Sequence, residues 1–171
     1  MAFEQARREA GIRPLKTEIK GGLLIGTATK PFHLTAKADR IDLLPDGRLA
    51  ILDYKTGRPP AAQSVRDGFA PQLPLEAVIA DQGGFKDLPR RTTGELAYLR
   101  LTGGNPPGEF LPALGKDAPD EAIANAWEGL NELIAAYDNP AQPYPALVRG
   151  EFAFPGDYDH LSRLDEWAIR S

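Results

Sequence analysis

The sequence predicts an α/β fold that contains a three-stranded antiparallel meander. Apolar and polar residues alternate in consecutive segments joined by short turns, which is typical of strands, and segments with helical periodicity follow them. The predicted strands cover residues 15–28, 32–43, 48–55 and 94–102, and the predicted helices lie at 3–11, near 71–83 and at 119–137. Three strands, a helix, a strand and a helix give a mixed α/β domain.

Glycine and proline mark the ends of these elements. The first helix stops at Gly11, and Pro45-Asp46-Gly47 forms a compact hairpin turn between the second and third strands. Pro71 opens the middle helix, because a missing N–H costs nothing in a first turn, and Gly83-Gly84 ends it. The long helix stops at Asn139-Pro140.

The chain of 171 residues suits a single domain, residues 1–171, with room for a sizeable core. Its first helix begins abruptly, so we expect a fragment of a larger subunit. Residues 140–171 are predicted to be a proline-rich segment followed by a C-terminal docking helix, in which Leu161, Leu164 and Trp167 share one face.

Composition narrows the class of protein. With 42% hydrophobic and 26% charged residues the chain is predicted to be globular, and no apolar run approaches the length of a membrane span. The charged N-terminus is not a secretory signal. The absence of cysteine excludes disulfides, thiolate zinc sites and an iron–sulfur cluster, and it agrees with a cytoplasmic location.

Charge is unevenly distributed along the chain. The net charge is −4, but residues 1–100 carry 16 Lys and Arg against 12 Asp and Glu, whereas residues 101–171 carry 4 against 12. A mildly basic first part is suited to phosphates, while the acidic remainder stays away from them. An asymmetry of this size is also common on ordinary protein surfaces, so both interpretations stay open.

Two carboxylates and an ammonium are expected to meet at one end of the sheet. Asp53 and Lys55 lie two apart in the third strand and therefore point the same way. Asp39 lies near the end of the preceding strand, and the hairpin register can place it beside Asp53. Mg²⁺ prefers hard oxygen ligands and usually takes one or two protein carboxylates. We therefore expect Asp39, Asp53 and the backbone carbonyl of Tyr54 to bind Mg²⁺ or Mn²⁺, with Lys55 stabilising developing negative charge.

An Asp-x-Lys tripeptide alone is weak evidence, and its order with other motifs is more informative. The succession ADRID, DG, ILDYKTG and PQLPLE over residues 15–81 resembles the RecB/AddB branch of the PD-(D/E)xK nuclease superfamily, and most closely the C-terminal nuclease domain of AddB subunits. The resemblance implies a restriction-endonuclease-like core with a mixed central sheet flanked by helices. It also implies that Asp39 and Asp53 bind the metal, that Lys55 is catalytic and that Gln72 supports the site.

The chain departs from the family pattern in three ways. Tyrosine is common four residues after the glutamine, but this chain has Glu76, which either helps to hold a metal or faces solvent. The cysteines that flank many AddB-type domains are missing. The family also places a His or Glu ligand on a helix well before the first strand, and only Glu4 and Glu9 are acidic candidates in what remains of that helix.

The resemblance implies a function and partners. We expect a Mg²⁺-dependent deoxyribonuclease that processes double-strand breaks for repair and recombination, with DNA and an AddA-like helicase–nuclease subunit as partners. Arg58 and Arg66 lie in flanking loops suited to phosphate contacts, and Lys37 shares the face of Asp39. The alternative is a non-catalytic scaffold or DNA-binding module that retains the nuclease fold.

Overall fold

The computed structural model describes residues 2–27, 29–104 and 108–143. The chain divides into a unit of residues Met1–Asp138 and a second unit of residues Asn139–Ser171, and the first unit contains all the elements described here. The elements, in chain order, are α1 (Ala2–Glu9), β1 (Arg13–Ile25), β2 (Phe32–Leu43), β3 (Leu49–Lys55), α2 (Ala62–Arg66), α3 (Gln72–Asp81), β4 (Thr93–Leu101), β5 (Gly108–Pro112) and α4 (Asp120–Asp138). The predicted docking helix lies outside the described residues, and it stays a prediction.

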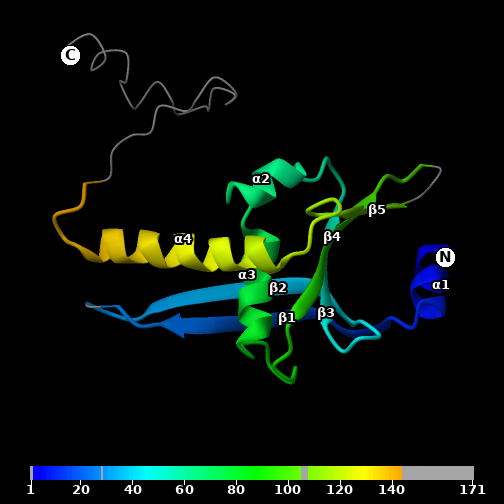
Figure 1. The fold of residues 1–171 in the computed structure, drawn as a ribbon, viewed down its shortest axis with the longest axis horizontal. Helices are drawn as coiled ribbons and strands as arrows, with labels where there is room; N and C mark the ends of the chain where they lie inside the picture. Colours follow the sequence, from blue (N-terminus) through cyan, green and yellow to red (C-terminus); the bar gives the residue numbers. More distant parts are fainter. Residues whose placement is uncertain (1, 28, 105–107, 144–171) are drawn as a thin grey trace, which may run out of the picture. The chain divides into compact units, whose positions relative to one another are not determined.

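The five strands form one mixed sheet in sequential order, β1-β2-β3-β4-β5 (Figure 1). All neighbours are antiparallel except β3 and β4, which run parallel. A parallel pair needs a crossover, and α2 and α3 provide it. The α/β fold class, the mixed sheet and the three-stranded antiparallel meander are therefore confirmed.

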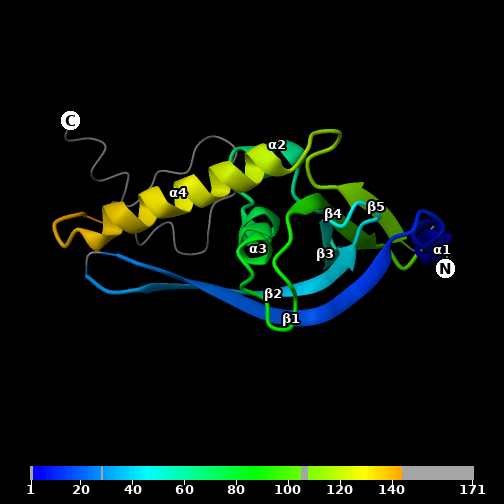
Figure 2. The ribbon, with the colours of Figure 1, turned by 60° about the horizontal axis from the view of Figure 1, so that its bottom comes forward.

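Helices lie on both faces of the sheet. Helix α3 crosses one face of the sheet, and α4 packs on α3, above the long β1–β2 hairpin (Figure 2). The core on this face joins α3 to the odd-numbered residues of β3 and to inward residues of β2 and β4; it includes Ile41, Leu49, Ile51, Leu73, Ile79 and Tyr98. Helix α1 packs against the other face, where its Phe3 ring stacks on Phe110 at 5.4 Å.

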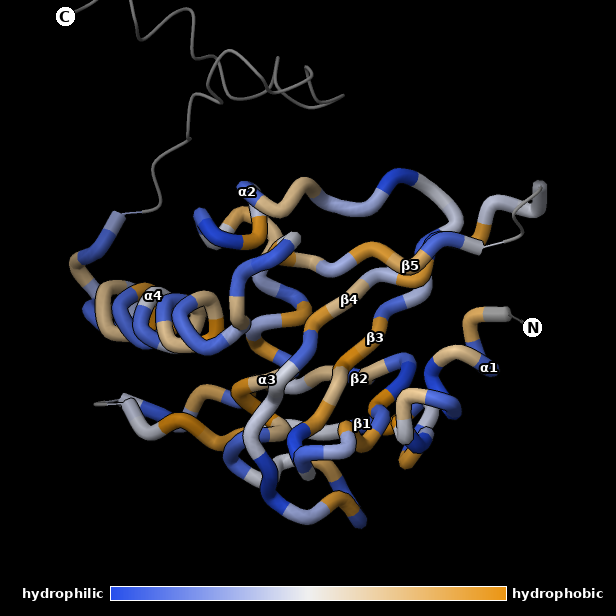
Figure 3. The backbone as a smooth tube through the Cα atoms, turned by 45° about the vertical axis from the view of Figure 1, so that its right-hand side comes forward, coloured by the Kyte–Doolittle hydropathy of each residue, from blue (hydrophilic) through white to orange (hydrophobic). Residues whose placement is uncertain are grey.

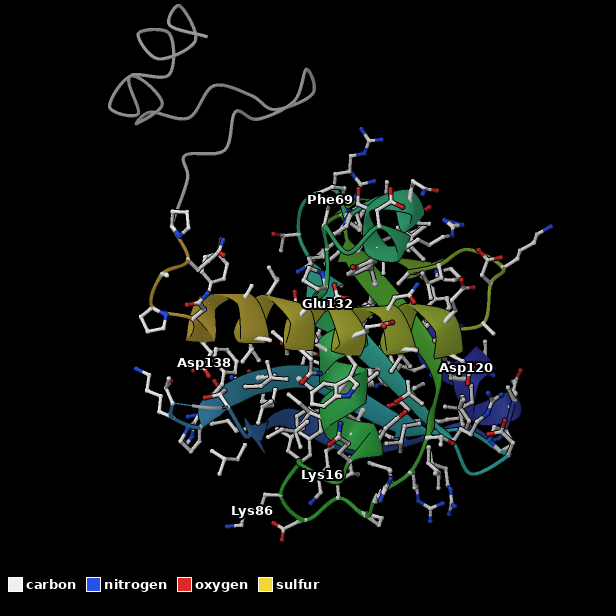
Figure 4. All side chains as sticks on the ribbon, turned by 60° about the vertical axis from the view of Figure 1, so that its left-hand side comes forward. Lys16, Phe69, Lys86, Asp120, Glu132 and Asp138 are labelled. Carbon is white, nitrogen blue, oxygen red and sulfur yellow. The ribbon has the colours of Figure 1, made fainter. Side chains whose placement is uncertain are left out.

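Hydropathy follows this arrangement. Strands β3 and β4, in the middle of the sheet, are largely hydrophobic (Figure 3). Helix α3 is apolar almost all round, as expected of a helix enclosed between a sheet and another helix. Helix α4 exposes a polar side, on which Glu132 lies (Figure 4). No helix in the described ranges has both the length and the apolar character that a bilayer crossing requires.

Two short elements lie within segments that the sequence predicts to be loops. Helix α2 has five residues and follows Pro59-Pro60, and β5 follows the glycine- and proline-rich stretch after β4. Both are too short to show a clear periodicity.

Candidate active site

Asp53 and Lys55 lie together at the end of β3. The strand is buried up to Asp53, which is 4% exposed, whereas the side chain of Lys55 is 31% exposed. Lys55 Nζ lies 2.9 Å from Asp53 Oδ2. The two groups form an ion pair outside hydrogen-bond geometry, and Oδ2 is itself buried. The expectation that the two side chains share a face is met.

Asp39 is adjacent to Asp53, as the hairpin register predicted. Arg40 pairs with Leu52, and the next step of the antiparallel register brings Asp39 opposite Asp53. The backbone N–H of Tyr54 donates a hydrogen bond of 2.9 Å to Asp39 Oδ2. This hydrogen bond fixes one carboxylate oxygen of Asp39. The carboxylates of Asp39 and Asp53 therefore belong to the same corner of the sheet.

A strained residue lies across from Asp39 on the edge strand. Glu18 has φ of +50° and lies between Thr17 and Ile19, which pair with Arg40 and Ala38. A residue other than glycine seldom adopts this conformation, and such strain often occurs near functional sites. Glu18 also forms an ion pair of 3.1 Å with Lys37 on the exposed edge.

Gln72, the first residue of α3, connects the acidic and basic groups. Its Nε2 donates to Asp53 Oδ1 at 2.7 Å and to Glu76 Oε1 at 3.2 Å. Its Oε1 accepts a hydrogen bond of 3.3 Å from Lys55 Nζ. The side-chain amide therefore fixes the positions of Asp53 and Lys55 relative to each other, and a supporting role for Gln72 in catalysis stays a prediction.

Glu76 is enclosed at the site, one helical turn after Gln72. It is 3% exposed, and its Oε2 has no hydrogen-bond partner. Burial raises the pKa of Glu76 to about 7; the hydrogen bond from Gln72 opposes this rise, and the negative charges of Asp53 and Asp39 add to it. Of the two alternatives left open by the sequence, the solvent-facing one is wrong.

Tyr98 lies beside Asp53 on the neighbouring strand β4 and was not identified from the sequence. The two residues are register partners in the parallel β3–β4 pair, and Tyr98 is 2% exposed. Burial, and after it the charges of Asp53 and Glu76, raises the pKa of Tyr98 to about 12. Lys55 Nζ lies 6.0 Å from the centre of its ring, within the range of a cation–π contact. The β3–β4 register would have identified Tyr98, but the strand pattern alone does not give it.

The N-terminal helix contributes no ligand to this site. Both guanidinium nitrogens Nη1 and Nη2 of Arg40 donate to Glu4, and this bonding lowers the pKa of Glu4 against the effect of burial. Glu9 is exposed and accepts a hydrogen bond from Gln5. The expectation that Glu4 or Glu9 is a candidate for the upstream ligand is therefore wrong, because α1 packs on the face opposite Asp39.

The three basic residues expected to bind DNA are in different surroundings. Lys37 pairs with Glu18, and Arg66 Nη2 lies 2.9 Å from Asp117 Oδ2. Arg58 is exposed in the loop after β3 and lines a surface hollow that also reaches Tyr98. Arg58 thus lies beside the site, and DNA contacts by all three residues stay predictions.

The residues present fit a divalent cation bound by two carboxylates. Across the described ranges, no three His, Asp or Glu side chains converge so that they hold an ion between them. Mg²⁺, however, usually takes only one or two protein carboxylates and keeps several waters. Asp39 and Asp53 supply that number, and Asp53 Oδ2 is buried with the ammonium of Lys55 beside it as an ion pair.

The fold and this corner together define a class of protein. The third strand of the meander ends in Asp-x-Lys, and a helix that begins with Gln72 and a parallel fourth strand follow it. This arrangement is restriction-endonuclease-like. Residues 1–149 match the PD-(D/E)XK nuclease superfamily, and the chain belongs to it. Membership indicates a nuclease, and enzymes of this superfamily typically use divalent metal ions.

Proteins similar to this chain include several from Rickettsia. The chain is 31% identical over 101 residues to the uncharacterized protein RT0391 of Rickettsia typhi, covering 58% of this chain and 12% of that protein. It is 34% identical over 83 residues to an uncharacterized protein of Rickettsia bellii, covering 48% and 10%. The chain thus spans about a tenth of the length of these relatives. The crystal structure of SSO0001 is similar at a TM-score of 0.40 and 12% identity, covering 84% of this chain and 68% of that one.

Proposed function

We propose that this chain is a Mg²⁺- or Mn²⁺-dependent DNA nuclease domain that processes double-strand breaks within an AddAB/RecBCD-like complex. The observation that carries the proposal is the contact network at the end of β3, where Asp53 is held by Gln72 and paired with Lys55, next to Asp39. This network combines metal-binding oxygens with a partly exposed ammonium. The great length of the relatives supports a domain of a longer protein, which we propose to be a helicase–nuclease subunit.

Each residue has a defined part in the proposed hydrolysis. Asp39, Asp53 and the carbonyl of Tyr54 would hold the cation, which when bound polarises the phosphoryl group and acidifies water. Lys55, whose ammonium is fixed by Asp53 and Gln72, faces the phosphate and stabilises its developing negative charge. Water attacks phosphorus, the P–O bond to the leaving nucleotide breaks, and the leaving oxygen takes up a proton.

The basic residues and partners complete the proposal. Arg58, beside the site, is proposed to contact the DNA backbone near the scissile phosphate, and Lys37 and Arg66 more distant phosphates. Salt bridges to Glu18 and Asp117 would then exchange for phosphate contacts. An AddA-like subunit is the proposed partner, and the cytoplasm, where the chromosome of a bacterium lies, is the proposed location.

Cleavage of end-labelled linear DNA tests the proposal. The parent chain is expected to cleave in Mg²⁺ or Mn²⁺, to stop on addition of EDTA, and to lose cleavage in Asp53→Asn. Glu132→Gln, which alters an exposed carboxylate on α4, is the matched control and should cleave like the parent. Metal-independent cleavage, or an active Asp53→Asn variant, would contradict the proposed site.

The second candidate function is a non-catalytic DNA-binding scaffold. The position of α1 favours it, because Glu4 bonds to Arg40 on the opposite face and α1 therefore does not supply the upstream ligand that the family resemblance implies. A scaffold would bind linear DNA without cutting it in either metal, and Asp53→Asn would leave that binding unchanged.

A further inference from the structure

Glu76 occupies a position that favours an apolar side chain. It lies in the middle of α3, among residues that are almost all buried and hydrophobic, and it is the only ionisable residue between Gln72 and Ala80. Burying a carboxylate is costly unless it is paired or bound to a metal. Packing alone therefore gives no reason for a glutamate at this point.

The contacts of Glu76 direct it toward the proposed cation site. Gln72 Nε2 donates to both Glu76 Oε1 and Asp53 Oδ1, so the two carboxylates lie on either side of one amide group. The other oxygen of each, Glu76 Oε2 and Asp53 Oδ2, is buried and accepts no hydrogen bond. Asp53 Oδ2 still has the ammonium of Lys55 at 2.9 Å, whereas Glu76 Oε2 lacks the donor that a buried carboxylate oxygen normally has, and a water of a hydrated cation would supply one.

The net charge of the carboxylates and Lys55 also favours a bound cation at this place. Three carboxylates, Asp39, Asp53 and Glu76, influence one another here, and Lys55 is the cation that the structure ties to them. When all four groups are ionised, two negative charges are left over, which a divalent cation neutralises. Of the described helices, α1 lies on the opposite face, whereas α3 carries Glu76 on the same side as Asp53.

We propose that Glu76 is the third carboxylate of the cation site and that it acts through a water molecule of the hydrated ion. In the described residues the three carboxylates do not converge to hold an ion directly, and a bridging water is the usual way for a further carboxylate to act on a hydrated Mg²⁺. This inference rests on the proposed metal-dependent function. It makes Glu76 a positioning residue of the cation.

Calorimetric titration of the whole chain with Mn²⁺, without DNA, tests the role of Glu76. Glu76→Gln keeps the size of the side chain and an acceptor for Gln72 but removes the charge, and it should weaken Mn²⁺ binding by about 10- to 100-fold. Glu76→Asp keeps the charge and should retain most of the affinity, because a bridging water adapts to the shorter side chain. Asp81→Asn, at the end of the same helix and bonded to Thr93, is the matched control and should bind Mn²⁺ like the parent.

Each result separates this inference from the proposed function. Unchanged Mn²⁺ affinity in Glu76→Gln, with affinity lost in Asp53→Asn, would overturn the role of Glu76 and leave the metal site intact. A parent chain that binds no Mn²⁺ would overturn both. Weakened Mn²⁺ binding in Glu76→Gln, in a chain that does not cleave DNA, would support the cation site and refute the nuclease.

Discussion

Replacing Glu76 by glutamine is expected to stabilise the metal-free protein, and the gain is expected to grow with pH. The folded-state pKa of Glu76 is about 7, raised by burial from the ordinary value of 4.5. The unfolded chain therefore gives up this proton at a lower pH than the folded chain does. Folding stability falls as pH rises from about 4.5 to about 7, and the loss is complete above that range.

The size of the effect follows from the pKa difference. A shift of one pKa unit corresponds to about 1.4 kcal/mol, so ionised Glu76 lowers the free energy of unfolding by about 3 kcal/mol at pH 8 and by about 1 kcal/mol at pH 5. A glutamine side chain at this position does not titrate and has no such dependence. The advantage of Glu76→Gln over the parent should accordingly rise by about 2 kcal/mol between these pH values.

Urea denaturation at pH 5, 6, 7 and 8 in EDTA measures this difference from the midpoint and the slope of each transition. Glu132→Gln removes an exposed carboxylate from α4 (Figure 4) and should follow the parent at every pH. If the stability difference between Glu76→Gln and the parent is the same at pH 5 and pH 8, the carboxyl is not held protonated in the folded state. The reasoning from its burial would then be refuted.

Three further variants test other parts of the structure. Arg7→Met leaves the fully buried Asp42 with one cation fewer, and urea denaturation should show that the free energy of unfolding falls by about 3 kcal/mol. A fall below about 1 kcal/mol would contradict the importance of the buried ion pair. Gly84→Ala places a methyl carbon 2.5 Å from the carbonyl oxygen of Gly22, so the melting temperature should fall by an amount equivalent to about 1–3 kcal/mol. An unchanged melting temperature would show that the backbone moves away at no cost. Lys55→Met should reduce DNA cleavage by about 100-fold or more, while the Mn²⁺ affinity measured by calorimetry stays near that of the parent. Equal losses of cleavage and of Mn²⁺ affinity would assign Lys55 to metal binding instead of catalysis.

The meander could be predicted because its signals are local. Asp46-Gly47 sets the turn between β2 and β3, and strict alternation places Asp53 and Lys55 on one face. The register that follows from this turn brings Asp39 next to Asp53, so the proposed metal ligands came from the sequence alone. Gln72 came from the family resemblance, since nothing local indicates that its side chain reaches back to β3.

Features that depend on packing between distant segments could not be predicted in this way. Tyr98 reaches the site because β4 runs parallel to β3, which depends on the α2–α3 crossover. The burial of Glu76 had a signal in the sequence, because residues 73–80 are otherwise apolar on all sides of the helix, as in an enclosed helix. The position of α1 had none, since its pairing with β2 joins residues that are far apart in the chain.

The two sides of β2 explain why the site depends on α3. Arg40 and Asp42 face α1, where Asp42 is fully buried and bonded by both Arg40 and Arg7. Asp39 alternates with them along the strand and therefore faces the other side, toward Asp53 and α3. A carboxylate on α1 would have to cross the sheet to reach the cation, whereas one on α3 is already beside it. Among the helices that the structure describes, α3 is therefore the one placed to offer an additional acidic group, and Glu76 lies on it.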